Sequence, residues 1–99
     1  MPYYPKSNFR LLGFQKSNKK NKMYDALIMN KHLQNINKVI FIPFGDKNYQ
    51  NYHDLTGLNK YPNLIHGEEK RRNAYRARAK HNLKDGYFSP SYFSYFYLW

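Results

Sequence analysis

The chain contains no cysteine and few acidic residues, and each shortage excludes a class of protein. Without cysteine, its 99 residues cannot form a disulfide framework or a thiolate metal site, so stability must come from side-chain packing. No stretch approaches the roughly 18 consecutive apolar residues of a membrane-spanning helix, and the first residues lack the apolar run of a signal peptide. We therefore expect a single small domain that has no membrane span and is not secreted.

The scarcity of acidic side chains leaves a large excess of positive charge. Lysine and arginine number 17 against 6 aspartates and glutamates, which gives a formal net charge of +11. Such an excess causes self-repulsion in a compact chain and is typical of proteins that bind a polyanion. We expect the polyanion to be nucleic acid, and DNA in particular.

Leucine, isoleucine and valine are also sparse, whereas aromatic residues are abundant. The chain has 11 tyrosines, 7 phenylalanines and 1 tryptophan. Each aromatic ring buries a large area, so rings can replace aliphatic side chains in a small core. We expect most of them to be packing residues and the rest to be available for contact with a partner.

Residues 1–22 are rich in lysine and contain no acidic side chain. Prolines, a glycine and a polar run give this segment neither helical nor strand periodicity, which predicts a flexible or extended basic arm. The remaining residues, 23–99, then form the single domain. Lys19, Lys20 and Lys22 of the arm are candidates for phosphate contacts, although a solvated tail that only aids solubility is an equal alternative.

Two short segments have the composition of β-strands. Residues 23–29 and 38–42 are rich in apolar and β-branched side chains, and a polar loop separates them. Pro43 lacks a backbone N–H and is expected to end the second strand. Because two strands alone are only marginally stable, helices must cover one face of this hairpin. The sequence therefore predicts an α+β fold in which a small β-hairpin packs against two or three helices, preceded by the basic arm.

Three later segments carry helix signals. A short helix is predicted between Asp46 and Gly57, and a longer one begins at Glu68 and meets no breaker until Gly86. A third begins after Ser89, a good N-cap residue that is followed by proline, and it is apolar nearly all round. We expect this last helix to pack on the hairpin as the main core element. The alternative is an exposed hydrophobic plug for a partner subunit or a membrane surface.

The middle helix carries a stripe of basic residues at i, i+4 and i+8. Arg72, Arg76 and Lys80 form the stripe, which is expected to point outwards and to suit phosphate oxygens, while Ala74, Ala77, Tyr75 and His81 form the inner side. A solvated basic face without a ligand is the alternative interpretation. The candidate nucleic-acid-binding residues, with the arm included, are Lys19, Lys20, Lys22, Lys70, Arg71, Arg72, Arg76, Arg78 and Lys80.

Few features of the sequence indicate catalysis. The four histidines lack the i, i+3 or i, i+4 spacing of a helical zinc site. A metal-dependent nuclease centred on His66, Glu68 and Glu69 is conceivable, but there is no glycine-rich phosphate loop, nucleophile elbow or paired-carboxylate pattern. We therefore predict no enzymatic activity, no catalytic residue, no metal ligand and no cofactor. His53 and His66 are expected to form hydrogen bonds within the fold.

Three strings taken together are similar to a known family. The strings FGDKNYQNYHDLTGL, HGEEKRRNAYRARAKH and SPSYFSYFYLW resemble a family of small uncharacterised proteins encoded by large nucleocytoplasmic DNA viruses, over about the last two-thirds of the chain. The chain departs from that family at Ala79, where a histidine is frequent, and at Tyr92 and Tyr95, where tryptophan is frequent. The resemblance implies a viral origin, with the protein in the virion or in a viral factory of the host cytoplasm. It implies no established activity.

Two hypotheses about function follow. In the first, the protein binds DNA non-specifically through phosphate contacts and serves genome condensation or packaging. In the second, it is a minor structural protein of a capsid, with its aromatic tail wedged between larger virion proteins. The first predicts binding that weakens steeply with salt, because counterions are released. The second predicts binding that depends mainly on buried apolar area.

Overall fold

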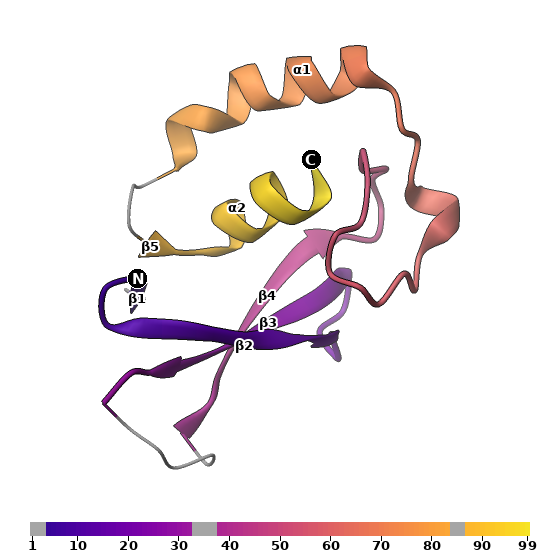
Figure 1. The fold of residues 1–99 in the computed structure, drawn as a ribbon. Coiled ribbons are helices and arrows are strands. Elements are labelled where there is room, and N and C mark those ends of the chain that lie inside the picture. Colours follow the sequence, from indigo (N-terminus) through magenta and orange to yellow (C-terminus); the bar gives the residue numbers. More distant parts are fainter. Residues whose placement is uncertain (1–3, 33–37, 84–86) are drawn as a thin grey trace.

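The protein has an α+β fold, which confirms the predicted class (Figure 1). The computed structural model describes residues 4–32, 38–83 and 87–99. Three long strands form an antiparallel sheet of order β2-β3-β4, and two short strands, β1 and β5, form a second antiparallel pair. The strands are β1 (Tyr4–Pro5), β2 (Phe9–Lys16), β3 (Lys22–Asn30), β4 (Ile40–Asp46) and β5 (Tyr87–Phe88). The helices are α1 (Glu69–Ala79) and α2 (Pro90–Phe93), with short 3-10 turns at Pro62–Leu64 and Lys80–Asn82 and a π-helical turn at Ser94–Leu98.

The predicted hairpin is present as β3 and β4. The two strands pair antiparallel from Lys22 opposite Asp46 to Ile28 opposite Ile40. The expected loop at 31–37 lies mostly outside the described residues. The prediction that Pro43 ends the second strand is wrong, because β4 continues to Asp46. Since β4 lies at the edge of the sheet, a proline there can leave the ladder intact.

The predicted basic arm is instead part of the sheet over much of its length. Strand β2 pairs with β3 from Phe9 opposite Asn30 to Lys16 opposite Tyr24, so the domain begins well before residue 23. The register shifts between Leu11 and Gly13, and a shift of this kind breaks the two-residue alternation of a strand. Leu11 and Phe14 consequently both pack on the core although they are three residues apart. This irregularity explains why the sequence showed no strand periodicity.

The helices lie in two layers on one side of the sheet. Figure 1 shows α2 next to the sheet and α1 beyond it, so that α2 lies between α1 and the strands. We call α2 and its π-helical continuation, residues 90–98, the C-terminal helix. Within the described ranges, no helix has the length and apolar character needed to cross a membrane.

The C-terminal helix is a core element, as predicted. Phe93 and Leu98 have no exposed surface, and neither do Tyr24 and Phe44 on the strands beneath them. The ring centroids of Phe44 and Phe93 are 5.5 Å apart, and Phe88 stacks on Phe93 at 5.4 Å. Aromatic rings therefore fill much of the core, in agreement with the composition. Ser89 is the N-cap of this helix, since its side chain accepts a hydrogen bond from the Tyr92 N–H at 3.1 Å.

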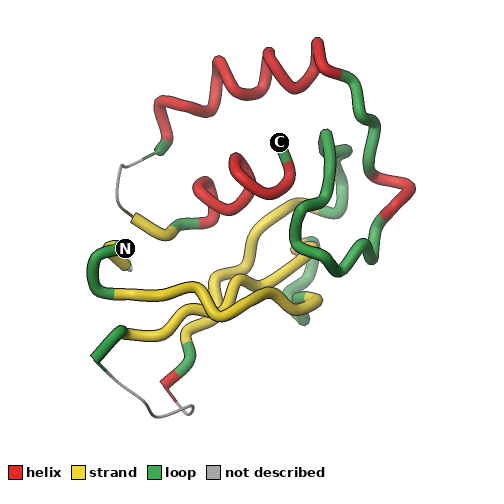
Figure 2. The backbone as a smooth tube through the Cα atoms, viewed as in Figure 1, coloured by secondary structure: helices red, strands yellow, loops and turns green. Residues whose placement is uncertain are grey.

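The short helix expected between Asp46 and Gly57 is absent. This part of the chain is an irregular loop, drawn green in Figure 2, which runs beside the end of the C-terminal helix. Its backbone N–H groups bond to distant segments: Asn51 donates to the Leu64 carbonyl at 2.7 Å, and Leu55 donates to the Tyr97 carbonyl at 2.9 Å. These tertiary hydrogen bonds replace the intrahelical ones that the local sequence favoured.

Tyr24 fastens the same loop to the sheet. Its buried hydroxyl donates to Asp54 Oδ2 at 2.5 Å and accepts from the Lys60 N–H at 2.9 Å. Burial, followed by the hydrogen bond to Asp54, raises the pKa of Tyr24 to about 12. These two hydrogen bonds attach the loop to the sheet and so help to fix the position of the segment between β4 and α1.

Candidate anion-binding cleft

Two of the predicted DNA contacts, Arg72 and Arg76, do not point outwards. Arg72 Nε donates to the main-chain oxygen of Trp99 at 2.7 Å, and its guanidinium lies 4.7 Å from the ring centroid of Tyr52. Arg76 Nε donates to the same oxygen at 3.2 Å, and its Nη2 is 3.4 Å from the Tyr95 carbonyl oxygen. The Arg76 guanidinium also lies 4.4 Å from the ring centroid of Tyr95. Both side chains are therefore engaged within the protein.

The physical reason lies at the end of the C-terminal helix. The last carbonyl groups of a helix have no intrahelical partner and carry partial negative charge. Backbone N–H groups of Tyr52 and His53 satisfy the Leu98 carbonyl at 3.0 and 3.1 Å. Arg72 and Arg76 supply further donors to this end of the helix. We call these two arginines the latch, because they connect α1 to the C-terminal helix.

The predicted inner side of α1 is also largely wrong. Ala74, Ala77 and His81 are exposed, and no residue of α1 is buried. Tyr75 does face inwards, where its ring stacks on Trp99 with centroids 4.2 Å apart and planes 12° apart. The contacts that hold α1 thus include the arginine latch and this aromatic stack, and a seam of small apolar side chains is not among them.

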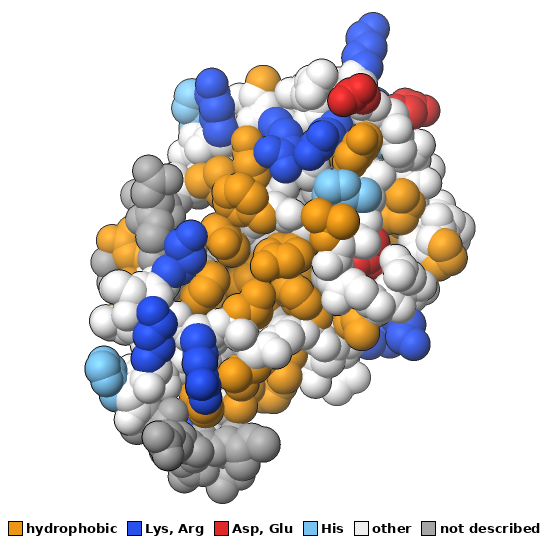
Figure 3. Space-filling view, in the orientation of Figure 1, with side chains coloured by type: hydrophobic (Ala, Val, Ile, Leu, Met, Phe, Trp, Pro, Cys, Tyr) orange, Lys and Arg blue, Asp and Glu red, His pale blue; other side chains and the backbone are white. Residues whose placement is uncertain are grey.

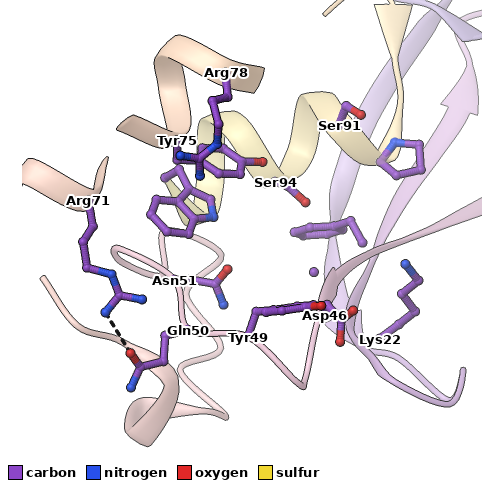
Figure 4. A pocket seen from close by; sticks show the side chains of 14 residues that line it. Lys22, Asp46, Tyr49, Gln50, Asn51, Arg71, Tyr75, Arg78, Ser91 and Ser94 are labelled. Atoms are coloured by element: carbon purple, nitrogen blue, oxygen red, sulfur yellow. Dashed lines mark hydrogen bonds between the residues drawn. The ribbon is translucent and has the colours of Figure 1, made fainter. Parts of the chain in front are cut away.

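The other predicted contacts remain accessible and fall into two sets. Lys22, Arg71 and Arg78 line a cleft between α1, the C-terminal helix and the end of β4 (Figure 4). Lys19, Lys20, Lys70 and Lys80 are exposed and lie outside its lining. Figure 3 shows that Lys and Arg side chains surround a central hydrophobic area on the face drawn there. The structure therefore brings three of the nine predicted residues together at one site.

The cleft has a volume of about 450 Å³ and a mixed lining. Figure 4 shows Arg71 and Lys22 on opposite sides, with Ser94 and Asn51 between them. Its aromatic lining consists of Phe44, Tyr49, Tyr75 and Trp99, and its uncharged polar lining of Gln50, Asn51, Ser91 and Ser94. This combination offers both flat apolar surfaces and hydrogen-bonding groups to a ligand.

Positive charge exceeds negative charge in the cleft. Among the described residues that line the cleft, Asp46 is the one carboxylate, and its Oδ1 accepts the Asn48 N–H at 2.8 Å. Arg71 Nη1 donates to Gln50 Oε1 at 2.9 Å and lies 3.9 Å from Glu68 Oε2. Both charged side chains are exposed to solvent, so this ion pair is weak. Among the residues that the structure describes, the Lys22 and Arg78 side chains have no hydrogen-bond or ion-pair partner. The cleft can therefore accept an anion.

The histidines near the cleft are structural. His66 Nδ1 accepts the Glu68 N–H at 2.9 Å, and burial, followed by the nearby Arg71 charge, lowers the pKa of His66. Burial also lowers the pKa of His53, and the charges of Arg72 and Arg76 act in the same direction. The hydrogen bond at Nδ1 agrees with the expectation for His66, but the expectation fails for His53, whose side chain makes no hydrogen bond within the described residues. The buried Nε2 atoms of both rings have no hydrogen-bond partner there. In the described ranges, no three His, Asp or Glu side chains gather in a way that could hold a metal ion.

The sequence did not indicate the aromatic and hydroxyl lining of the cleft. Tyr49 lies in the loop after β4, Tyr75 in α1 and Ser91 in the C-terminal helix, and only the folded chain brings these three segments together. No protein-family model, curated protein or solved structure matches this chain. The chemistry of the cleft is therefore the guide to function. That chemistry is three cations, one carboxylate, four aromatic rings and four uncharged polar side chains around a small space.

Proposed function

We propose that the protein binds nucleic acid through phosphate contacts at this cleft and at the lysines beside it. The observation that carries the proposal is the pair of unpartnered cations, Lys22 and Arg78, which line a cleft with a single carboxylate in a chain of net charge +11. Phosphate oxygens are strong acceptors for such groups, and contacts of this kind do not read base sequence. The binding is therefore non-specific, and DNA is the expected partner.

Two exposed lysines outside the cleft lining, Lys19 and Lys20, add positive charge close to Lys22 along the chain. Lys19 and Lys20 occupy the turn that leads into β3, and the Lys22 N–H donates to the Lys19 carbonyl at 3.2 Å. This tight turn keeps three lysines close together. Arg72 and Arg76 leave the set of contacts because the latch occupies them. If about five phosphates are neutralised, affinity falls roughly five-hundredfold between about 50 and 200 mM salt.

The resemblance to proteins of large DNA viruses suggests a biological setting for this binding. Every residue that lines the cleft except Lys22 belongs to one of the three strings that carry the resemblance. We propose that the protein is viral and acts in genome condensation or packaging, in the virion or in a cytoplasmic viral factory. The capsid alternative loses its main support, because Phe93 and Leu98 of the aromatic tail pack in the protein's own core.

Fluorescence anisotropy with random-sequence DNA at several salt concentrations tests the proposal. The double variant Lys22→Gln/Arg78→Gln should bind at least about tenfold more weakly at 100 mM salt and show a smaller salt slope. The control, Lys31→Gln/Lys60→Gln, removes the same charge from exposed positions outside the cleft lining and should lose much less affinity. No binding by the wild type at 100 mM salt would refute the function. Equal losses in the two variants would refute this surface.

A further inference from the structure

We infer that the cleft receives a single unpaired nucleotide of a nucleic acid strand, so that the protein prefers single-stranded over duplex nucleic acid. This inference rests on the proposed function and specifies its ligand. It combines three observations: an aromatic lining, cations on opposite sides, and a space of about 450 Å³.

The aromatic lining offers rings to a base. Tyr49 lines the cleft with 69% of its surface exposed, and it is the most exposed large hydrophobic side chain among the described residues. The stacked pair of Tyr75 and Trp99 lines the same cleft. Bases of every kind stack on aromatic side chains, and removing one such ring weakens binding roughly five- to hundredfold. An unpaired base is thus a ligand that this lining suits.

The positively charged side chains of the cleft lie where they could contact the two phosphate groups that flank a nucleotide within a strand. Such a nucleotide carries a phosphate group on each side, and Figure 4 shows Arg71 and Lys22 on opposite sides of the cleft. The Ser91 and Ser94 hydroxyls also line it and have no hydrogen-bond partner within the described part of the chain. These hydroxyls can donate to phosphate or sugar oxygens, or accept from a base edge. The polar groups therefore complement the backbone that flanks a bound base.

The size of the cleft suits a ligand as large as one nucleotide. Pockets for small-molecule ligands range from about 300 to 1,000 Å³, and the cleft lies in the lower part of this range. In a duplex the bases are stacked and paired, so only phosphates could reach the mouth of the cleft. A single strand can turn one base inwards without breaking a pair. We therefore expect single strands to gain contacts that a duplex cannot make.

The test measures anisotropy with three labelled probes of equal length: a thymidine single strand, an abasic single strand and a duplex. At 100 mM salt the thymidine strand should bind at least about tenfold more tightly than either of the others. The Tyr49→Ala variant should weaken binding of the thymidine strand roughly five- to hundredfold and leave duplex binding unchanged. The control Leu55→Ala removes another exposed apolar side chain, 58% exposed and outside the cleft lining, and should bind like the wild type.

Trp99 provides a second readout, because it is the only tryptophan in the chain and it lines the cleft. Its fluorescence should change on addition of the thymidine strand and remain constant with the abasic strand. Equal binding of all three probes, with no effect of Tyr49→Ala, would refute the nucleotide site while leaving nucleic acid binding intact. Failure to bind any probe would refute the proposed function itself.

Discussion

Replacing Arg72 with glutamine should destabilise the protein substantially, because Arg72 belongs to the latch. Its Nε donates to the Trp99 oxygen at 2.7 Å, and its guanidinium lies 4.7 Å from the Tyr52 ring centroid. A hydrogen bond from a charged group contributes about 1.5 to 3 kcal/mol, and a cation–π contact at an exposed site about 0.5 to 1 kcal/mol. Arg76 still donates to the same oxygen at 3.2 Å, and Arg72 is only half-buried. The two contributions together amount to about 2 to 4 kcal/mol. We expect the unfolding free energy of Arg72→Gln to fall by about 2 kcal/mol, the lower end of this combined range.

Urea and thermal unfolding followed by circular dichroism measure this loss. For a domain of this size, 1 kcal/mol corresponds to about 4 to 8 °C, so the Tm of Arg72→Gln should fall by about 8 to 16 °C. Arg78→Gln is the matched control, because it makes the same substitution on an exposed face of the same helix. Its unfolding free energy should lie within about 0.5 kcal/mol of the wild type.

The result that would refute the reasoning is an equal and small effect of the two substitutions. Arg72 would then be solvated like Arg78, as the i, i+4 stripe in the sequence had suggested. The Trp99 main-chain oxygen would then have to accept hydrogen bonds from groups other than Arg72. An intermediate loss in Arg72→Gln, with a larger one when Arg76→Gln is added, would fit two arginines that share one acceptor.

Two further predictions concern the core and the histidines. Gly45 has a φ of +76°, and a Cβ there would lie 3.0 Å from Leu98 Cδ1 and 3.1 Å from Met23 Sδ, so Gly45→Ala should cost about 2 to 4 kcal/mol in urea unfolding. Gly57→Ala is the control, because Gly57 has a φ of +86° with open space around it, so only backbone strain is added and the cost should be about 1 kcal/mol. Equal losses of unfolding free energy in the two variants would contradict the steric argument for Gly45. Because the folded state lowers the pKa of His53 from 6.5, the unfolded chain binds the proton first as the pH falls. The unfolding free energy should therefore decrease below pH 6.5, and less steeply in His53→Gln; identical slopes would show that His53 does not contribute.

The parts of the fold that follow from local signals could be predicted from the sequence. Ser89 followed by Pro90 marks the start of the C-terminal helix, and the side chain of Ser89 does cap it. The apolar and β-branched runs that became β3 and β4 were equally clear. Strand β2 was missed because the irregularity between Leu11 and Gly13 disrupts its alternation. The loop after β4 was mistaken for a helix because its backbone partners lie far away in the sequence.

The candidate site was predictable only in its charges. Arg71, Arg78 and Lys22 were expected to contact an anion because of their type and their basic surroundings. Tyr49 and the serines of the C-terminal helix join them only because α1 folds back over that helix. Helical spacing could not decide the direction of the basic stripe, since the sequence does not reveal that the end of another helix lies beneath it.

One face of helix α1 lines the cleft, and the neighbouring face carries the latch arginines that contact the C-terminal helix. Arg71, Tyr75 and Arg78 recur at i, i+4 and i+7 and line the cleft, whereas Arg72 and Arg76 are each one position further along the helix. Neighbouring positions differ by about 100° around a helix, so the latch fixes the rotation at which the other face meets the cleft. Because α1 has no buried residue of its own, this rotation depends on the Trp99 oxygen and the Tyr75–Trp99 stack. Arg72 and Arg76, which do not line the cleft, are thus what holds the cleft-lining Arg71 and Arg78 in place.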